Sequence, residues 1–566
     1  MVLDRFSPAT REWFDGAFAA PTPAQLGAWE AVASGSHALV VAPTGSGKTL
    51  AAFLWSIDQL ITRPGEGSRV LYISPLKALG VDVERNLRAP LVGITQTAKR
   101  LGLEPPAITV GVRSGDTTAG DRRLLARTPP DILITTPESL YLMLTSAARE
   151  SLKGVETVII DEVHAVAATK RGAHLAVSLE RLDALLATPA QRIGLSATVR
   201  PLEEVARFLG GRAPVTIVQP PAAKTFDLTI EVPVDDMTEP GILAPREGSS
   251  SGPTGMVAEA TGSIWPHVEE AIVDRILEHR STIVFANSRR LAERLTARLN
   301  EIAMERAQLA PSGSSSGTAA YRDLTDEDPD ADGRSRQARP ALGAQLAPSG
   351  SSSGTAAHRD LTDEDPDADG RSRQARPALG ARPALGAQLA VQTSGAPPLL
   401  ARAHHGSVSK EQRATIEDDL KTGKLRCVVA TSSLELGIDM GAVDLVIQVE
   451  SPPSVASGLQ RIGRAGHQVG EISKGVLFPK HRTDLLHTSV AVDRMRHGQI
   501  EAITIPANPL DVLAQQTVAA TALEGIDVED WFDTVRRSAP FATLPRSAFD
   551  ATLDLLAGLY PSDEFA

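Results

Sequence analysis

Short apolar runs alternate with longer amphipathic stretches along most of the chain, and this alternation occurs as two successive series. The first series includes His37–Val41 and Val158–Ile160, and the second includes Thr282–Phe285 and Leu445–Val449. Strands that alternate with helices are typical of a doubly wound parallel sheet. We therefore predict an α/β protein with two tandem parallel-sheet lobes. The other strands predicted on the same grounds are 70–73, 132–134 and 192–195 in the first series and 427–429 in the second.

One segment departs from this pattern. Residues 307–343 recur as 344–380, a period of 37 residues, with Tyr321 replaced by His358 as the only change. The copies are rich in Gly, Ser, Pro and Asp, so they cannot bury enough apolar surface to offset the entropy of ordering the chain. We predict a disordered insertion over 307–390. A solvated duplication in a surface loop is favoured over a regulatory or partner-binding segment.

The composition limits the class of protein. With 566 residues, of which 42% are hydrophobic, the chain can bury several cores, so two or three domains are expected. The N-terminus is charged where a secretory signal would be apolar, and no run approaches the roughly 18 apolar residues that span a bilayer, which predicts a cytoplasmic protein. The formal net charge of −12 argues against a surface that is basic throughout, but it leaves room for a basic cleft. The single cysteine, Cys427, excludes an intramolecular disulfide, and its apolar surroundings in the sequence predict a buried thiol.

Candidate chemistry begins directly after the predicted strand that ends at Val41. The segment Ala42–Thr49 reads Ala-Pro-Thr-Gly-Ser-Gly-Lys-Thr and precedes a helical run. Such a loop wraps backbone N–H groups around phosphate, while its Lys meets the β- and γ-phosphates and its hydroxyl meets Mg²⁺. We therefore predict a P-loop that binds ATP and Mg²⁺, in which Lys48 also acts in catalysis. The predicted ligands are Thr44, Gly45, Ser46, Gly47, Lys48 and Thr49, with Thr49 facing the metal.

A pair of carboxylates follows another strongly apolar strand. Asp161 and Glu162 come directly after Ile160. From this position Asp161 can hold Mg²⁺ through water, while Glu162 can orient and deprotonate an attacking water. An Asp-Glu pair alone is usually a polar loop start, but a P-loop about 110 residues upstream makes a Walker B site the better interpretation.

Further blocks occur in the order found in superfamily 2 helicases. Ser196-Ala-Thr198 resembles motif III, the segment 283–290 resembles motif IV, and the segment 460–466 resembles motif VI. Within that superfamily the chain resembles the Lhr (large helicase-related) family over nearly its whole length outside the insertion. The blocks that carry this resemblance are 74–79, 404–407, 430–444 and 450–457. The resemblance implies two RecA-like lobes in an ATP-driven helicase.

The resemblance also implies roles for individual residues. Gln25, in a block that resembles a Q motif, is expected to bind the adenine edge, and Asp439 is expected to contact the ribose or the lobe interface. Gln460, Arg461 and Arg464 are expected at that interface, with the two arginines reaching the γ-phosphate from the second lobe. The residues expected to couple the ATP site to the strand are His164, Ser196 and Thr198. The residues expected to contact strand phosphates are Lys77, Arg113, Thr136, Arg289, Ser407 and Thr431.

The predicted organisation and function follow from these blocks. The predicted parts are lobe 1 (1–220), a link and lobe 2 entry (221–265), lobe 2 (266–306 and 391–498), the insertion (307–390) and an incomplete, mainly helical winged-helix module (499–566). Because members of the family continue beyond this module, the chain is expected to be truncated. The function implied is a nucleic-acid-stimulated ATPase that moves 3′ to 5′ on single-stranded DNA and unwinds DNA or RNA:DNA duplexes in DNA repair. An RNA-remodelling helicase similar to the DEAD-box type, or a non-motor fragment that binds nucleic acid, is the alternative.

Overall fold

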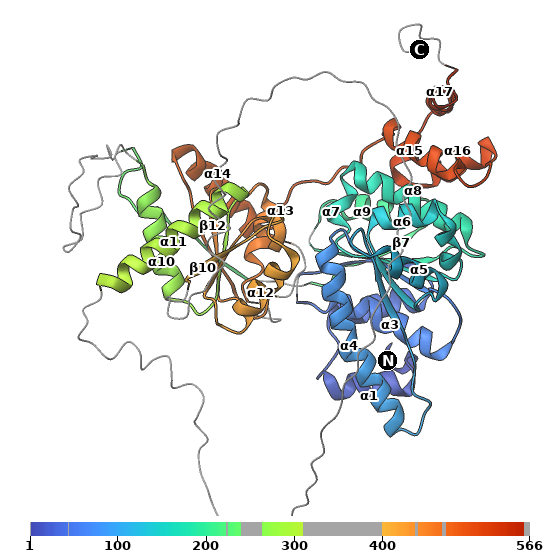
Figure 1. The fold of residues 1–566 in the computed structure, drawn as a ribbon, viewed down its shortest axis with the longest axis horizontal. Helices are drawn as coiled ribbons and strands as arrows, with labels where there is room; N and C mark the ends of the chain where they lie inside the picture. Colours follow the sequence, from blue (N-terminus) through green and yellow to red (C-terminus); the bar gives the residue numbers. More distant parts are fainter. Residues whose placement is uncertain are drawn as a thin grey trace, which may run out of the picture. The chain divides into compact units, whose positions relative to one another are not determined.

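Two parallel sheets, each with helices on both faces, make up most of the computed structural model (Figure 1). The predicted fold class is therefore confirmed. No helix among the residues described is long and apolar enough to cross a membrane. The structure describes residues 2–43, 45–197, 199–221, 225–238, 263–309, 399–435, 440–466 and 471–559.

Lobe 1 is built on the seven-stranded sheet, whose strand order is β3-β4-β2-β5-β6-β1-β7. Its strands are β1 (His37–Val41), β2 (Val70–Ile73), β3 (Val110–Arg113), β4 (Ile132–Thr135), β5 (Thr157–Ile160), β6 (Gln191–Ser196) and β7 (Val215–Val218). Its helices are α1 (Pro8–Ala17), α2 (Pro23–Ala33), α3 (Lys48–Thr62), α4 (Lys77–Arg100), α5 (Ala119–Arg127), α6 (Pro137–Leu144), α7 (His164–Ala167), α8 (Lys170–Leu185) and α9 (Leu202–Gly210). Successive residues of β1 point to opposite faces, so Ala38 and Val40 pack with α1 to α4, while Leu39 and Val41 pack with α6 to α9.

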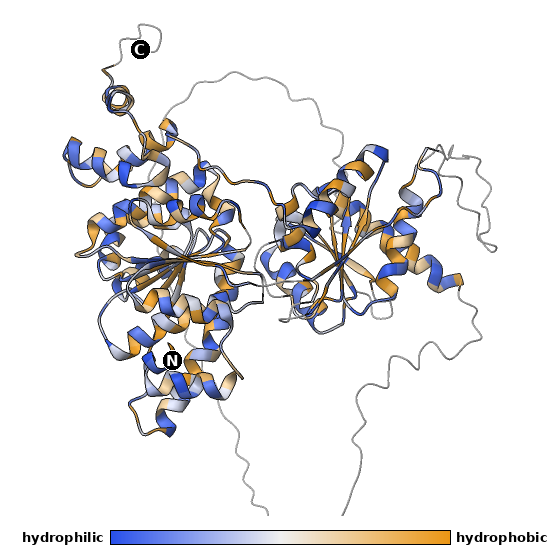
Figure 2. Ribbon diagram, turned by 180° about the vertical axis from the view of Figure 1, so that it is seen from behind, coloured by the Kyte–Doolittle hydropathy of each residue, from blue (hydrophilic) through white to orange (hydrophobic). Residues whose placement is uncertain are grey.

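Lobe 2 is built on the six-stranded sheet, whose strand order is β10-β11-β9-β12-β13-β8. Its strands are β8 (Phe226–Ile230), β9 (Thr282–Phe285), β10 (Ala401–His404), β11 (Cys427–Ala430), β12 (Leu445–Val449) and β13 (Ser473–Phe478). Its helices are α10 (Trp265–Leu277), α11 (Arg289–Leu309), α12 (Lys410–Lys421), α13 (Val455–Ile462) and α14 (Arg482–Arg496). Helices α10 and α11 share a core with one face of the sheet, and α12 to α14 share a core with the other. Figure 2 shows the apolar strands enclosed between helices whose outer sides are hydrophilic.

The boundaries of lobe 2 differ from the predicted ones in two places. Strand β8 pairs with β13, so the lobe 2 sheet already includes Phe226–Ile230 from the segment predicted as a link and lobe 2 entry. Helix α11 continues past 306 to Leu309, into the start of the predicted insertion. The rest of the insertion, 310–390, lies outside the described residues, so its disorder stays a prediction.

The helices that follow lobe 2 pack against lobe 1. They are α15 (Leu510–Thr521), α16 (Val528–Arg537) and α17 (Arg546–Leu556), and their apolar core includes Ala173 and Val177 of α8. Arg181 of α8 donates to Gln516 Oε1 at 2.9 Å and to the carbonyls of Ala519 and Leu144 at 3.1 and 3.4 Å. Both carbonyls lie in the last turn of a helix, where a cation is favourable. The guanidinium of Arg181 therefore joins α15 to α6.

A buried ion-pair network also connects these helices to the lobe 1 sheet. Glu180 of α8 is 4% exposed and pairs with Arg192 of β6 at 2.9 Å and with Arg537 of α16 at 3.2 Å. Asp183 pairs with the same Arg192 side chain at 2.6 Å. Because charges removed from water are costly unless paired, this network makes the position of α16 depend on the interior of lobe 1.

We predict that Glu180→Ala lowers the free energy of unfolding by about 2 kcal/mol, because the buried Arg192 and the partly exposed Arg537 each lose a charged partner, while Arg192 keeps Asp183. Thermal and urea unfolding would measure the loss. The matched control is Glu84→Ala, which removes the partner of Arg88, a side chain that is 71% exposed, and should cost less than about 0.5 kcal/mol. Equal costs in the two variants would contradict the structural role of the buried network.

Candidate nucleotide site and interlobe cleft

The predicted P-loop connects β1 to α3, with Gly47 as the N-terminal cap of that helix. Gly45 and Gly47 have φ angles of 84° and 78°, a left-handed conformation that favours glycine. The loop therefore presents the N-terminus of a 15-residue helix, whose free N–H groups and dipole attract anions. Thr49 lies in the first turn of this helix, and Thr44 lies outside the described residues.

Gln25 and Thr22 hold the P-loop from the side. Thr22 begins α2 in a capping box with Gln25, whose Oε1 accepts from the Thr22 N–H at 2.9 Å. The Thr22 hydroxyl donates to the carbonyl of Ser46 at 2.9 Å. A Cβ placed on Gly47 would lie 2.6 Å from Gln25 Nε2, so only glycine fits there without a shift. The carboxamide expected to bind adenine therefore also packs against the phosphate loop.

The carboxylates of the predicted Walker B site follow β5. Asp161 is buried and accepts a hydrogen bond from the Tyr72 hydroxyl. Burial raises the pKa of Asp161 to about 6, and the adjacent Glu162 carboxylate acts in the same direction. Glu162 has a left-handed φ of 46°, and its buried Oε2 has no hydrogen bond to the described residues and lies 3.4 Å from His164 Nδ1. A strained residue with an unsatisfied acceptor fits the role of orienting a water.

The charges of the P-loop and of the Walker B site act on each other. Lys48 Nζ donates to the carbonyl of Ala42. Burial lowers the pKa of Lys48, the carboxylates of Glu162 and Asp161 oppose that shift, and the guanidinium of Arg464 adds to it. Mg²⁺ usually takes only one or two protein ligands and completes its shell with phosphate and water. A set of Thr49 and Asp161 beside the P-loop fits that donor chemistry.

His164 connects this site to lobe 2. Its Nδ1 lies 3.1 Å from Ser196 Oγ, and its Nε2 lies 2.8 Å from Nε2 of Gln460 on α13. Burial lowers the pKa of His164 to about 4, so the ring is neutral near pH 7. Because the amide nitrogen of Gln460 can only donate, His164 Nε2 must accept, and the ring proton lies on Nδ1 toward Ser196. Three residues predicted to couple the sites or line the interface are thus brought together, and Thr198 lies outside the described residues.

The two predicted arginine fingers differ in their surroundings. Arg461 is 3% exposed and makes its contacts inside lobe 2, with Glu435 at 3.1 Å, Asn287 at 2.9 Å and Gln448 at 3.0 Å. Arg464 donates to the carbonyl of Glu435 at 2.8 Å, and its charge acts on Lys48 of lobe 1. The reach of Arg461 to a phosphate therefore stays a prediction, since its contacts here organise lobe 2. Asp439 lies outside the described residues.

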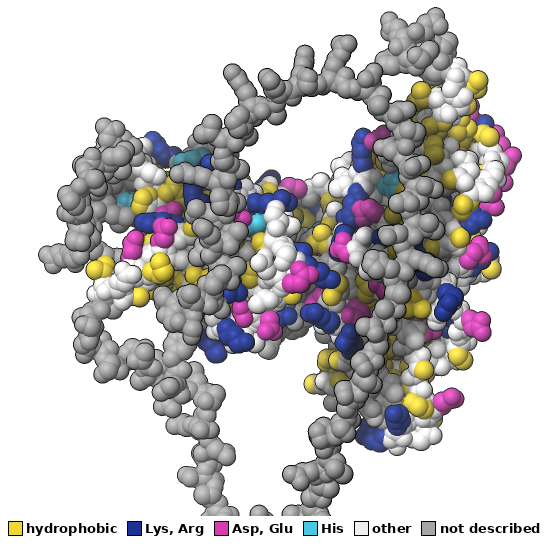
Figure 3. Space-filling view, viewed as in Figure 1, with side chains coloured by type: hydrophobic (Ala, Val, Ile, Leu, Met, Phe, Trp, Pro, Cys, Tyr) yellow, Lys and Arg dark blue, Asp and Glu magenta, His cyan; other side chains and the backbone are white. Residues whose placement is uncertain are grey.

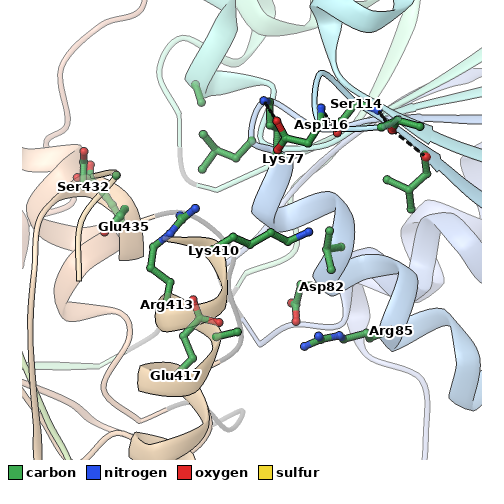
Figure 4. A pocket seen from close by; sticks show the side chains of 18 of the residues that line it. Lys77, Asp82, Arg85, Ser114, Asp116, Lys410, Arg413, Glu417, Ser432 and Glu435 are labelled. Atoms are coloured by element: carbon green, nitrogen blue, oxygen red, sulfur yellow. Dashed lines mark hydrogen bonds and ion pairs between the residues drawn. The ribbon is translucent and has the colours of Figure 1, made fainter. Parts of the chain in front are cut away.

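A cleft of about 1000 Å³ lies between α4 of lobe 1 and α12 of lobe 2 (Figure 4). Among the predicted strand contacts, Lys77, Arg289 and Thr431 line it. Arg289 donates to the hydroxyl of Ser407 at 2.9 Å, which places Ser407 beside the cleft. His164 and Gln460 line the same cleft, so it adjoins the residues that join the lobes.

The other two predicted strand contacts do not line the cleft. Arg113 ends β3, between Val112 and Ser114, which do line it. Thr136 is buried, and its hydroxyl accepts from the Ser139 N–H as the N-terminal cap of α6. The side chain of Thr136 therefore has a local structural task in this structure, and its contact with a strand stays a prediction.

Three family models match successive parts of the chain. A DEAD/DEAH box helicase model matches residues 22–206, a helicase conserved C-terminal domain model matches 391–468, and a model for the winged helix domain of the large helicase-related protein matches 493–566. With the two parallel-sheet lobes, these matches define the class as superfamily 2 helicases.

Similarity to individual proteins identifies the family. The chain is 62% identical to a Lhr helicase/probable uracil glycosylase of Mycolicibacterium smegmatis, over 100% of this chain and 32% of that protein. It is 54% identical to the Lhr helicase/uracil glycosylase of Escherichia coli, over 100% of this chain and 33% of that protein. The structure of Mycobacterium smegmatis helicase Lhr bound to ssDNA and AMP-PNP matches with a TM-score of 0.75 and 60% identity, over 98% of this chain and 58% of that one. This chain belongs to the Lhr family, and it spans about a third of the length of these two bacterial relatives.

We predict that Gly47→Ala weakens binding of an ATP analogue about tenfold or more, because a left-handed φ costs a non-glycine residue roughly 1–2 kcal/mol and the new Cβ meets Gln25. Isothermal titration calorimetry would measure the affinity. Gly67→Ala is the matched control, since Gly67 has a φ of 81° and a Cβ added there would meet nothing within 4 Å, and it should leave the affinity unchanged. An unchanged affinity for Gly47→Ala would contradict the assignment of this loop as the phosphate cradle.

Proposed function

We propose that this chain is an ATP- and Mg²⁺-dependent DNA translocase that moves 3′ to 5′ on single-stranded DNA and unwinds DNA or RNA:DNA duplexes, with a role in DNA repair. The observation that carries the proposal is the hydrogen bond between His164 and Gln460, which joins the nucleotide site of lobe 1 to lobe 2 beside a large cleft. A motor needs such a link, because the state of the nucleotide must change how the lobes hold the strand. The relative in the matched structure was solved with ssDNA and AMP-PNP.

Different residues of lobe 1 would bind the nucleotide, hold Mg²⁺ and activate the attacking water. The P-loop N–H groups and Lys48 would bind the phosphates, and Gln25 would bind the adenine edge. Thr49 and Asp161 would hold Mg²⁺, which supplies charge neutralisation on the phosphates. Glu162 would orient and deprotonate the attacking water, since its buried Oε2 accepts no hydrogen bond from the residues that the structure describes.

Lobe 2 would complete the site. Arg464 would stabilise the charge that develops on the γ-phosphate, a role supported by the effect of its guanidinium on Lys48. Gln460 would couple lobe closure to His164 and Ser196 through its hydrogen bond to the imidazole. Asp439 would contact the ribose or the lobe interface. The strand would be held through its phosphates by the cations and hydroxyls at the cleft, which makes binding independent of sequence.

We predict that Lys48→Ala and Glu162→Gln both abolish ATP hydrolysis but differ in binding. Lys48→Ala should weaken ATP affinity because the phosphates lose a cation, whereas Glu162→Gln should keep the affinity and trap a closed complex on the strand. Steady-state hydrolysis and ATP titration, each with and without single-stranded DNA, would measure this. Near-normal turnover in either variant would contradict the two-site assignment.

The same assay distinguishes the proposed function from its alternatives. Stronger stimulation of the parent by RNA than by single-stranded DNA would identify an RNA-remodelling enzyme. Nucleic-acid binding without hydrolysis by the parent would identify a non-motor fragment. Displacement of a labelled strand from substrates with a 3′ or a 5′ single-stranded tail would test the direction of movement.

We predict that Arg464→Ala leaves ATP binding nearly intact but lowers strand-stimulated turnover by a factor on the order of 10³, the scale of a lost transition-state arginine. Arg464→Lys should not restore the rate, because an ammonium cannot reproduce the planar guanidinium. Arg461→Ala is the comparison variant, and it should lower the unfolding temperature because it removes a buried guanidinium that pairs with the partly buried Glu435. A raised Michaelis constant with an unchanged turnover number in Arg464→Ala would show that Arg464 acts in binding alone.

A further inference from the structure

The cleft between α4 and α12 is lined by equal numbers of cations and carboxylates, but most of the carboxylates are already engaged. The lining cations are Lys77, Arg85, Arg289, Lys410 and Arg413, and the lining carboxylates are Asp82, Asp116, Asp121, Glu417 and Glu435. Three of the carboxylates lie beside basic side chains: Asp116 is 2.5 Å from Lys77, Glu417 is 3.0 Å from His404, and Glu435 is 3.1 Å from Arg461. Asp121 accepts from the Thr118 hydroxyl at 2.7 Å.

Among the described residues, only Lys77 of these five cations has a carboxylate partner, and Arg289 instead donates to the Ser407 hydroxyl. Arg85 and Lys410 are exposed, and no carboxylate among the described residues lies within 4.0 Å of either charged group. An exposed cation stays hydrated, so leaving it without a carboxylate partner costs little free energy. Where most nearby carboxylates already have partners, such a cation makes the local electrostatic potential positive. On the face shown in Figure 3, described basic and acidic side chains are interspersed, which agrees with a net charge of −12. A positive potential that attracts a polyanion therefore has to come from local cations such as Arg85 and Lys410.

These two cations belong to different lobes and share one space. Figure 4 shows Lys410 extending from the start of α12 toward α4, from which Arg85 and Asp82 point into the same cleft. Arg85 is eight residues beyond Lys77 on α4, about 12 Å along the helix axis at 1.5 Å per residue. The two cations of α4 would thus meet different phosphates of one extended strand.

We propose that Arg85 and Lys410 are strand-phosphate ligands that hold one backbone from the two lobes. This proposal rests on the proposed function, and it adds two residues that lie outside the helicase motifs used to predict strand contacts. A cation from each lobe on one strand makes strand occupancy favour lobe closure, because both contacts form only when the lobes approach. Because both side chains are proposed to contact phosphates and not base edges, the contacts are independent of sequence.

The test is equilibrium binding of fluorescein-labelled oligothymidylate to the full chain, measured by anisotropy over a range of salt concentrations. Arg85→Gln and Lys410→Gln should each weaken binding by a factor on the order of 5 at low salt and reduce the slope of log affinity against log salt by about 0.7. The double variant should lose about twice that slope. Oligodeoxycytidylate should give the same losses, since phosphates are common to both strands.

The controls remove cations that do not line the cleft. Arg88→Gln changes a residue three positions beyond Arg85, which pairs with Glu84 at 2.7 Å, and Lys424→Gln changes an exposed residue just beyond α12. Both should keep the slope of the parent. Unchanged slopes in Arg85→Gln or in Lys410→Gln, or losses that depend on the base, would overturn the two-lobe contact. If the parent itself neither binds the strand nor hydrolyses ATP faster with it, the proposed function fails, and the two failures are thereby distinguished.

Discussion

The hydrogen bond from Gln460 Nε2 to His164 Nε2 is 2.8 Å long and links α13 of lobe 2 to the turn that carries Glu162 in lobe 1. It requires a neutral imidazole, because a protonated ring has no acceptor to offer. Burial enforces this state, since it lowers the pKa of His164 to about 4. The ring then has one donor and one acceptor, and both are used, toward Ser196 and toward Gln460.

Parallel pairing explains why residues from distant parts of the chain meet at this ring. Every strand pair recorded within the two described sheets is parallel, so the carboxyl ends of the strands lie along one edge of each sheet. The P-loop follows β1, Asp161 follows β5 and Ser196 ends β6, and all three strands are near neighbours in lobe 1. Polar residues placed after buried strands are therefore collected at the same edge without any further signal.

The same principle decides what could be predicted from the sequence. All eight predicted strands are present, because each is fully or nearly fully buried and reads as a mainly apolar run. The five strands not predicted are β3, β7, β8, β10 and β13, and four of them form the sheet edges, where half-exposed positions break the apolar run. The P-loop and the Walker B carboxylates were predictable because their chemistry is local. The contact of Tyr72 with Asp161 spans 89 residues and the contact of Arg461 with Asn287 spans 174, so neither leaves a local pattern. The contact of Thr22 with Gln25, by contrast, does leave a local pattern, because the spacing of the two residues is that of a capping box.

Helix α8 connects the C-terminal helices to the segment of lobe 1 that follows His164. It begins at Lys170, six positions after His164, and its outer side carries α15 and α16 through Arg181 and Glu180. The C-terminal helices and lobe 1 therefore form one packed unit that is joined through α8. The segment that follows His164 is thus held, through α8, by contacts that span 335 and 357 residues of sequence.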